Sequence, residues 1–198
     1  MTKGWVPSVL VIMILMLVGF STGLFPKTII DDAGASDALF KVACGLLVTH
    51  LSTLISRKEM AAQWKTVIAS LGKAMSVQRC SCAGFGDSTD FGIYTFPGAS
   101  PGESEYFKPV TAESKTELLG YIDEFEKVID SLRDGDEGAD LVNNYRFSRD
   151  DIDESDYLYI YDREGKPIGD GAYLKYDYYN VYFFDSQTTT LYYFHNNI

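Results

Sequence analysis

The chain has 198 residues, of which 46% are apolar and 23% are charged, and its formal net charge is −11. This mixture permits one buried core and excludes a disordered acidic tail, a collagen-like fibre and a disulfide-rich miniprotein. The excess of acid argues against a general nucleic-acid-binding protein, because binding to the phosphate backbone needs concentrated Lys and Arg. Three Cys and two His leave few side chains for a metal site or a catalytic pair. We therefore expect no cofactor, no metal site and no nucleic-acid partner.

Residues 1–26 predict a transmembrane anchor. The 23 residues between Lys3 and Lys27 are uncharged and include the apolar run Val9–Val18. A hydrocarbon core of about 30 Å needs about 20 helical residues, so this stretch is long enough to cross it. The alternative is a cleavable signal peptide, since Ser21–Gly23 supplies small residues at cleavage-like spacing. The uncharged stretch exceeds the usual apolar core of such signals, about 7–15 residues, which favours the anchor.

The segment 27–79 contains a second apolar stretch, Val42–Ile55, within 15 uncharged residues between Lys41 and Arg57. Two interpretations stay open: a second span that forms a helical hairpin with the first, or an amphipathic helix of the soluble domain. Lys27 is the one basic residue of the intervening loop, whereas five basic residues follow the second stretch. The positive-inside rule therefore favours the hairpin, at the cell membrane, with the C-terminal domain cytoplasmic rather than exported.

Residues 57–79 predict a basic amphipathic helix. Apolar side chains recur at helical spacing, at Trp64, Val67, Ile68, Leu71 and Met75. The helix could lie on an anionic lipid surface with Trp64 at the headgroup level, or it could be an ordinary amphipathic helix that continues from the preceding one. The following segment, 80–110, is rich in Gly and Pro, so we expect a loop or linker there, with at most a short strand at Phe91–Phe96.

The predicted domain of residues 111–198 begins with an amphipathic helix. Ser114–Glu117 reads as a capping box, and Gly135 is a plausible C-terminal stop. An apolar stripe follows on one helix face, at Leu118, Ile122, Phe125, Ile129 and Leu132, with Tyr121 and Val128 beside it. We expect this stripe to cover a sheet.

From residue 157 onward the hydrophobic period changes to two. Strand-like runs occur at Tyr157–Tyr161, Ala172–Tyr178, Val181–Asp185 and Leu191–His195, with turn residues between them. The pattern predicts a four-strand antiparallel meander whose apolar face needs the preceding helix as a cover. The predicted fold class is therefore α+β: one amphipathic helix on a C-terminal meander, behind an N-terminal transmembrane helix or two-helix hairpin.

Tyrosine and acid are both concentrated in this domain. Ten of the fourteen Tyr fall between residues 157 and 193, and residues 123–170 hold 16 Asp and Glu against 6 Lys and Arg. Tyrosine on a solvent-facing sheet buries a large area on binding, although aromatic residues also simply favour strands. Dense acid attracts a basic partner, although it is also typical of solvated loops. The candidate partner-binding residues are Tyr157, Tyr159, Tyr161, Tyr176, Tyr178, Asp151, Asp153 and Asp156.

Three further sequence features do not match a metal-binding, disulfide or catalytic motif. The segment Asp134–Asp140 alternates acids with glycines, but an EF-hand needs Glu at the twelfth loop position, which is Tyr145 here. Cys80 and Cys82 are too close in sequence for an ordinary disulfide. We expect His195 to be an edge residue of the last strand, with no catalytic partner.

These patterns predict a non-catalytic, membrane-tethered protein that binds a protein partner, as an inhibitor, an immunity-type protector or an assembly subunit. The excess of acid favours a partner that is basic in charge. Membrane lipid is its second expected partner. The alternative is an exported domain that binds carbohydrate or cell-wall material through tyrosines. A hydrolase that uses paired carboxylates such as Asp151 and Asp153 is a third class.

Overall fold

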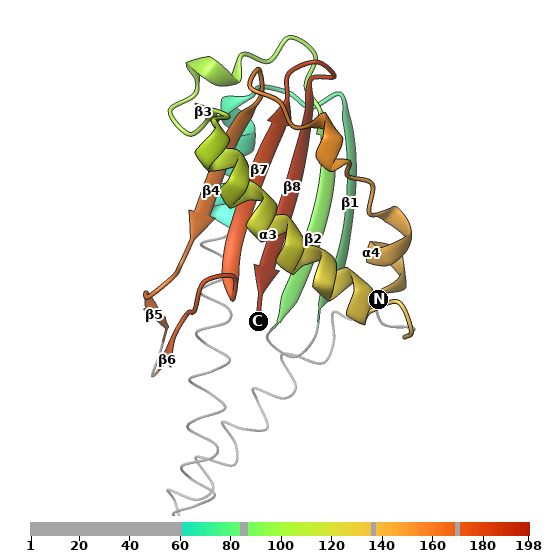
Figure 1. Ribbon diagram of the computed structural model, residues 1–198. Coiled ribbons are helices and arrows are strands. Elements are labelled where there is room, and N and C mark those ends of the chain that lie inside the picture. The colour runs from blue at the N-terminus through green and yellow to red at the C-terminus, as the bar shows by residue number, and fades with distance from the viewer. Residues whose placement is uncertain (1–60, 84–86, 136–137, 169–170) are drawn as a thin grey trace, which may run out of the picture. The chain divides into compact units, whose positions relative to one another are not determined.

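The computed structural model describes residues 61–83, 87–135, 138–168 and 171–198 (Figure 1). The chain divides into two compact units, Met1–Leu54 and Ile55–Ile198, and all the described residues belong to the second. The predicted transmembrane anchor and second apolar stretch lie outside the described residues. Within the described ranges, no helix combines the length and the hydropathy that a membrane crossing requires.

The centre of the domain is a six-stranded antiparallel sheet with the strand order β1-β2-β8-β7-β4-β3. Its strands are β1 (Ser76–Ala83), β2 (Ser88–Thr95), β3 (Lys108–Pro109), β4 (Tyr157–Asp162), β7 (Tyr178–Asp185) and β8 (Thr190–Asn197). The long helix α3 (Ala112–Ser131) packs on the sheet, so the predicted α+β class is confirmed for this part of the chain. β4, β7 and β8 correspond to three of the four predicted strands.

The prediction of a loop or linker over residues 80–110 is wrong for its first half. β1 and β2 form a hairpin there, and β2 pairs with β8 from Ser88↔Asn197 to Thr95↔Thr190. The sheet therefore begins well before residue 111. The glycines and serines that indicated a loop are tolerated because aromatic residues of β2, such as Phe91 and Tyr94, are fully buried.

The fourth predicted strand, Ala172–Tyr178, is also wrong. Gly171–Ala172 form β6, which pairs with β5 (Pro167–Ile168) in a separate two-stranded ribbon, and Tyr178 already belongs to β7. The backbone then turns at Tyr176, whose φ of +74° is rare for a residue other than Gly. The Asp177 carboxylate accepts a hydrogen bond from the Leu174 amide and closes the turn. Aromatic content indicated a strand where the local hydrogen bonds make a turn.

The helix α3 begins earlier than its predicted capping box. Its N-cap is Thr111, whose hydroxyl accepts from the Ser114 amide, while the Ser114 hydroxyl accepts from the Thr111 amide. The helical stripe is as predicted: Leu118, Ile122, Phe125 and Ile129 are all at most 1% exposed. The helix ends at Ser131, before Gly135.

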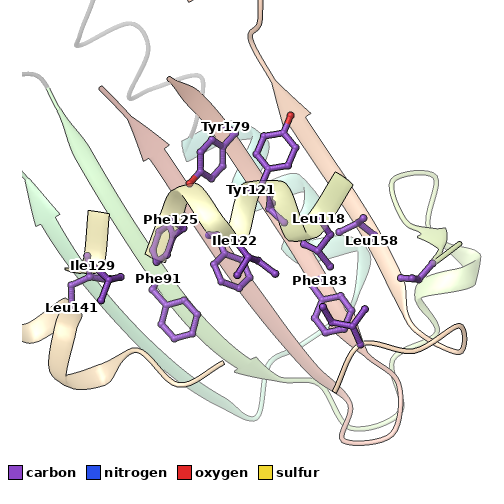
Figure 2. Close-up of a cluster of buried hydrophobic side chains, with 14 of the residues drawn as sticks. Phe91, Leu118, Tyr121, Ile122, Phe125, Ile129, Leu141, Leu158, Tyr179 and Phe183 are labelled. Carbon is purple, nitrogen blue, oxygen red and sulfur yellow. The ribbon is translucent and has the colours of Figure 1, made fainter. Parts of the chain in front are cut away.

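One face of the sheet is apolar and lies against α3 (Figure 2). Alternate residues of the strands point to this face, among them Phe91, Val181, Phe183 and Phe194. The Phe125 ring contacts the Phe194 ring edge-on, with 5.4 Å between centroids. The short helix α4 (Ala139–Asn144) extends the cover towards β1 and buries Leu141. This face follows the sequence pattern closely.

The opposite face of the sheet is covered by a helix over residues 61–70, which lies behind the sheet in Figure 1. Val67 is fully buried there, and Trp64 packs on Tyr94 with 6.0 Å between ring centroids. A Cβ at Gly92 would lie 2.5 Å from the Tyr94 ring, so only glycine leaves room for it. Because Trp64 faces the sheet, the interpretation that places it at the lipid headgroups is wrong. An amphipathic helix is present over residues 61–70, but the prediction that it extends to residue 79 is wrong, because Ser76–Ala83 form β1.

Candidate functional site

The sheet distributes the candidate tyrosines over both faces. Tyr157, Tyr159, Tyr161 and Tyr178 share the face that the 61–70 helix covers, where the Tyr161 and Tyr178 rings make an edge contact. Tyr176 lies on the α3 side, edge-on to Tyr121 with 4.9 Å between centroids. The structure therefore brings four of the five candidates to one face and separates the fifth.

Few of these tyrosines are available to a partner. Tyr178 is 1% exposed, and Tyr157, Tyr159, Tyr161 and Tyr176 are half-buried. The prediction of a solvent-facing tyrosine surface is not supported, because helices cover both faces of the sheet. The alternation of strand residues does not reveal this, since every residue of β7 is buried whichever face it points to.

Two of the three candidate acids, Asp153 and Asp156, accept hydrogen bonds that stabilise turns at one end of the sheet. Asp156 is fully buried, and its carboxylate accepts from the amides of Asp153 at 2.8 Å and Ser186 at 3.0 Å. Burial raises the pKa of Asp156, whereas hydrogen bonds from Ser155 lower the pKa of Asp153. Asp151 is exposed. These carboxylates fasten residues 153–156 to the β7–β8 turn, and Asp151 stands apart from them.

His195 differs most from its predicted role. It is 0% exposed on the central strand β8, so the prediction of an edge residue is wrong. Its Nδ1 lies 2.9 Å from the Tyr179 carbonyl oxygen, which assigns the ring proton to Nδ1. Its Nε2 then accepts from the Ser88 hydroxyl at 3.2 Å. The sequence gives no sign of this pair, because its members are 107 residues apart.

The Ser88–His195 pair has the connectivity of a nucleophile and its base, but its electrostatics differ from that role. Burial lowers the pKa of His195 from an ordinary 6.5 to about 4. A base this weak is a poor proton acceptor at neutral pH. The neighbouring acid, Asp90, is paired with Arg79 at 3.2 Å. We therefore assign the pair to the hydrogen bonding that joins β2, β7 and β8.

More polar groups line the same face. The Tyr193 hydroxyl donates to the Asn180 side-chain oxygen at 2.8 Å, and Asn180 is itself fully buried. The Arg79 guanidinium lies over the rings of Trp64 and Tyr193, at 5.8 and 6.0 Å from their centroids. These groups form an interior polar layer between the sheet and its covering helix.

The exposed acids form a larger feature, which we call the acidic surface. It comprises the acidic side chains of residues 112–135 and 138–154, on α3, α4 and the segment that follows them. Twelve acids occur there against five basic residues, and none of the twelve is buried. Arg149 neutralises part of it, since it pairs with Asp123 and Glu126 and so ties residues 149–151 to α3. The remaining acids face solvent on the α3 side of the sheet.

The segment that contains the 61–70 helix and β1 is basic. Residues 61–83 contain Lys65, Lys73 and Arg79 and no acid. Lys65 and Lys73 are exposed, and Arg79 is the one that pairs with an acid, Asp90. Acids also lie beside this segment, since Glu103 and Glu105 flank Ser104, whose hydroxyl is hydrogen-bonded to that of Ser70.

The comparisons with known proteins add no relative. The chain matches no protein-family model, no curated protein and no solved structure.

Among the residues that the structure describes, no group of three or more His, Cys, Asp or Glu could hold a metal ion. Burial raises the pKa of the Cys80 thiol to about 11, so this side chain is a protonated core residue at neutral pH.

Proposed function

We propose that this protein is a non-catalytic, membrane-tethered domain that binds a basic protein partner, as an inhibitor, an immunity-type protector or an assembly subunit. One observation carries the proposal: twelve acidic side chains lie on α3, α4 and the segment that follows them, against five basic ones, and none of the twelve is buried. Such a surface attracts a basic partner over a distance and speeds its association.

The proposed surface differs from the one that the sequence indicates. Acids on α3 and after it replace the tyrosines as the main contact, because Tyr178 is buried and the other four candidate tyrosines are half-buried. The carbohydrate-binding alternative has less support, because it needs a more exposed aromatic platform than these rings present.

The membrane anchor is part of the proposal and is supported by the sequence of residues 1–26. We expect the tether to hold the domain at the cytoplasmic side, where the leaflet is anionic. The acidic side would then be repelled from the leaflet and left available to the partner.

The first experiment tests the acidic surface in the full-length chain, crosslinked in its own cells and captured. A surface variant combines Glu117→Gln, Asp150→Asn and Asp151→Asn, and a control variant with the same charge change combines Asp87→Asn, Glu103→Gln and Glu105→Gln. All six acids are exposed. We expect a basic partner whose capture weakens at high salt and falls severalfold in the surface variant alone. Equal capture by the two variants would refute the acidic surface.

The second experiment tests the tether. Full-length protein with residues 1–26 attached is expected in the membrane pellet after high-speed centrifugation, and a chain without them in the supernatant. A membrane-impermeant thiol reagent should label a Glu117→Cys variant only after the cells are broken. Labelling in intact cells would place the domain outside and contradict the cytoplasmic assignment.

A further inference from the structure

Two tyrosine rings on the α3 side of the sheet already hold an ammonium group. The Tyr121 ring, from α3, meets the Tyr176 ring edge-on, with 4.9 Å between centroids. The Nζ atom of Lys175 lies over both rings, 5.7 Å from the Tyr121 centroid and 5.3 Å from the Tyr176 centroid. An aromatic face attracts a cation over distances up to about 6 Å. We call Tyr121 and Tyr176 the tyrosine pair.

Both rings of the tyrosine pair are held by contacts within the domain. The Tyr121 hydroxyl donates a hydrogen bond to the Asp162 carboxylate. The Tyr176 carbonyl oxygen accepts one from the side-chain amide of Asn196 at 3.2 Å. A Cβ at Gly120 would lie 2.8 Å from the Tyr176 hydroxyl oxygen, so glycine at this position of α3 leaves room for the ring. The orientation of the two rings is therefore set before a partner arrives.

The carboxylates around the tyrosine pair create a negative field. Asp162 contacts the Tyr121 hydroxyl directly, and Glu117 lies one helical turn away from Tyr121 on α3. Burial raises the pKa of this hydroxyl, and the Asp162 and Glu117 carboxylates raise it further, as neighbouring anions do. Glu124, one turn away in the other direction, is neutralised by Lys127 at 2.7 Å. The field of Asp162 and Glu117 is left to a cation at the rings.

Lys175 is a weakly held occupant of this site. Its side chain is exposed, and it forms no ion pair with any residue that the structure describes. Tyr121 is 2% exposed, so a second cation reaches its ring only when Lys175 moves aside. A partner has an advantage in this exchange, because its other basic residues contact the rest of the acidic surface at the same time.

We propose that the tyrosine pair receives a lysine side chain of the basic partner, which displaces Lys175 from the rings. This inference rests on the proposed function, because it names one contact through which the acidic surface recognises its partner. Lysine is the residue chosen, since the group that the rings already hold is an ammonium. Lys175 is then an internal competitor, which a protein with scattered basic charge leaves in place. Tyr176, one of the candidate tyrosines, returns to the interface.

The test uses the full-length chain, purified with detergent, and a fluorescent nine-residue peptide in which three lysines alternate with pairs of glycines. Fluorescence anisotropy measures the dissociation constant. Tyr176→Leu removes one ring without changing the charge and should weaken peptide binding about three- to fivefold. Tyr176→Phe keeps the ring and is the matched control, so it should bind as the unsubstituted chain does. Far-ultraviolet circular dichroism verifies that both variants are folded.

A second pair of variants tests the internal competitor. Lys175→Met leaves the rings free and should tighten peptide binding about three- to fivefold. Lys73→Met makes the same charge change at an exposed position outside the acidic surface, and it should alter binding far less. Unchanged binding by Tyr176→Leu, or an equal gain in the two methionine variants, would overturn the proposal.

Capture in cells separates this proposal from the function on which it rests. Loss of the basic partner in Tyr176→Leu, with retention in Tyr176→Phe, supports both. A partner that the surface variant loses and Tyr176→Leu retains overturns the role of the tyrosine pair and leaves the acidic surface standing. A chain that captures no basic partner refutes the proposed function, and the peptide measurements still decide whether the rings receive a lysine.

Discussion

The two faces of the sheet are built from alternate residues of the same strands, yet they differ in chemistry. The α3 face is packed mainly with Phe, Ile, Leu and Val, and its rings meet edge to face. The face under the 61–70 helix contains Tyr, Asn, His and an Arg–Asp pair, with Tyr94 and Tyr182 fully buried. The first face gains stability by removing apolar surface from water, whereas the second depends on satisfying polar groups that are buried with it.

This difference teaches where the domain is robust and where it is sensitive. An apolar contact tolerates small shifts, but a buried hydrogen bond is lost outright when one partner is removed or protonated. We therefore expect truncation to be the most damaging change on the α3 face, and protonation or hydroxyl removal to be the informative changes on the opposite face.

The largest expected effect is on the α3 face. Phe125→Ala removes a fully buried ring that packs between Phe91, Tyr145 and Phe194, and it should lower the free energy of unfolding by roughly 3–5 kcal/mol. Urea unfolding followed by near-ultraviolet circular dichroism measures the loss. Glu117→Ala, on the exposed side of the same helix, should change it by less than about 0.5 kcal/mol. If Phe125→Ala lowered the free energy of unfolding by less than a hydroxyl removal on the opposite face does, the expectation that truncation is most damaging on the α3 face would be refuted.

The second-largest expected effect is a loss of stability at low pH, which arises from His195 on the face under the 61–70 helix. Above pH 6.5 His195 is neutral in the folded and unfolded chain, so it adds no pH dependence. Below pH 6.5 the unfolded ring gains a proton and the folded ring, with its pKa of about 4, does not. Stability is therefore lost as the pH falls through this window, by about 1.4 kcal/mol per pH unit and about 3 kcal/mol in all.

Urea unfolding between pH 5.0 and 6.5 measures this slope before most carboxylates titrate. Asp90 and Arg79 are the charged groups near the ring, and they form an ion pair with each other. A His195→Phe variant should lose the slope, and a His50→Gln variant should keep it. A slope that survives in His195→Phe would show that another group is responsible.

The smallest expected change in the free energy of unfolding comes from removing single tyrosine hydroxyls on the face under the 61–70 helix. It distinguishes a hydroxyl that makes a hydrogen bond from one that makes none. Tyr193→Phe removes the donor to Asn180 and should cost about 1–2 kcal/mol, because a buried acceptor loses its partner. Tyr182→Phe removes a buried hydroxyl that has no hydrogen-bond partner among the described residues, so its effect should be near zero or stabilising. Equal costs in urea unfolding would indicate that the Tyr182 hydroxyl is satisfied in solution.

The sequence predicts the elements whose hydrophobic period is regular. The stripe of α3 and the alternation in β4, β7 and β8 predict the class of each element and the packing of α3 on the sheet, but not the pairing of β4 with β7 or of β8 with β2. β1 escapes the prediction, and β2 is anticipated only as a short strand at Phe91–Phe96, because Gly92 and several serines resemble a loop. Gly92 is in fact needed to accommodate the Tyr94 ring. The segment 172–178 misleads in the opposite sense, since its tyrosines indicate a strand where the Tyr176 backbone turns.

The candidate site is less predictable than the fold. Strand alternation tells which residues share a face, but it does not tell whether a helix covers that face, so the tyrosines are assigned to solvent. The Ser88–His195 and Arg79–Asp90 pairs depend on strand register, which sequence spacing alone does not fix. The excess of acid after residue 112 is visible in the sequence, and only its gathering on one side needs the structure.

The position of β8 has a consequence for folding kinetics. β8 pairs with β7, its neighbour along the chain, and also with β2, roughly 100 residues earlier. A β7–β8 hairpin closes a short loop, whereas joining β2 to it means closing a very long one, and such distant pairings slow folding. We therefore expect the β1–β2 hairpin to dock late. Until it does, β8 presents an unpaired edge that a chaperone would have to shield.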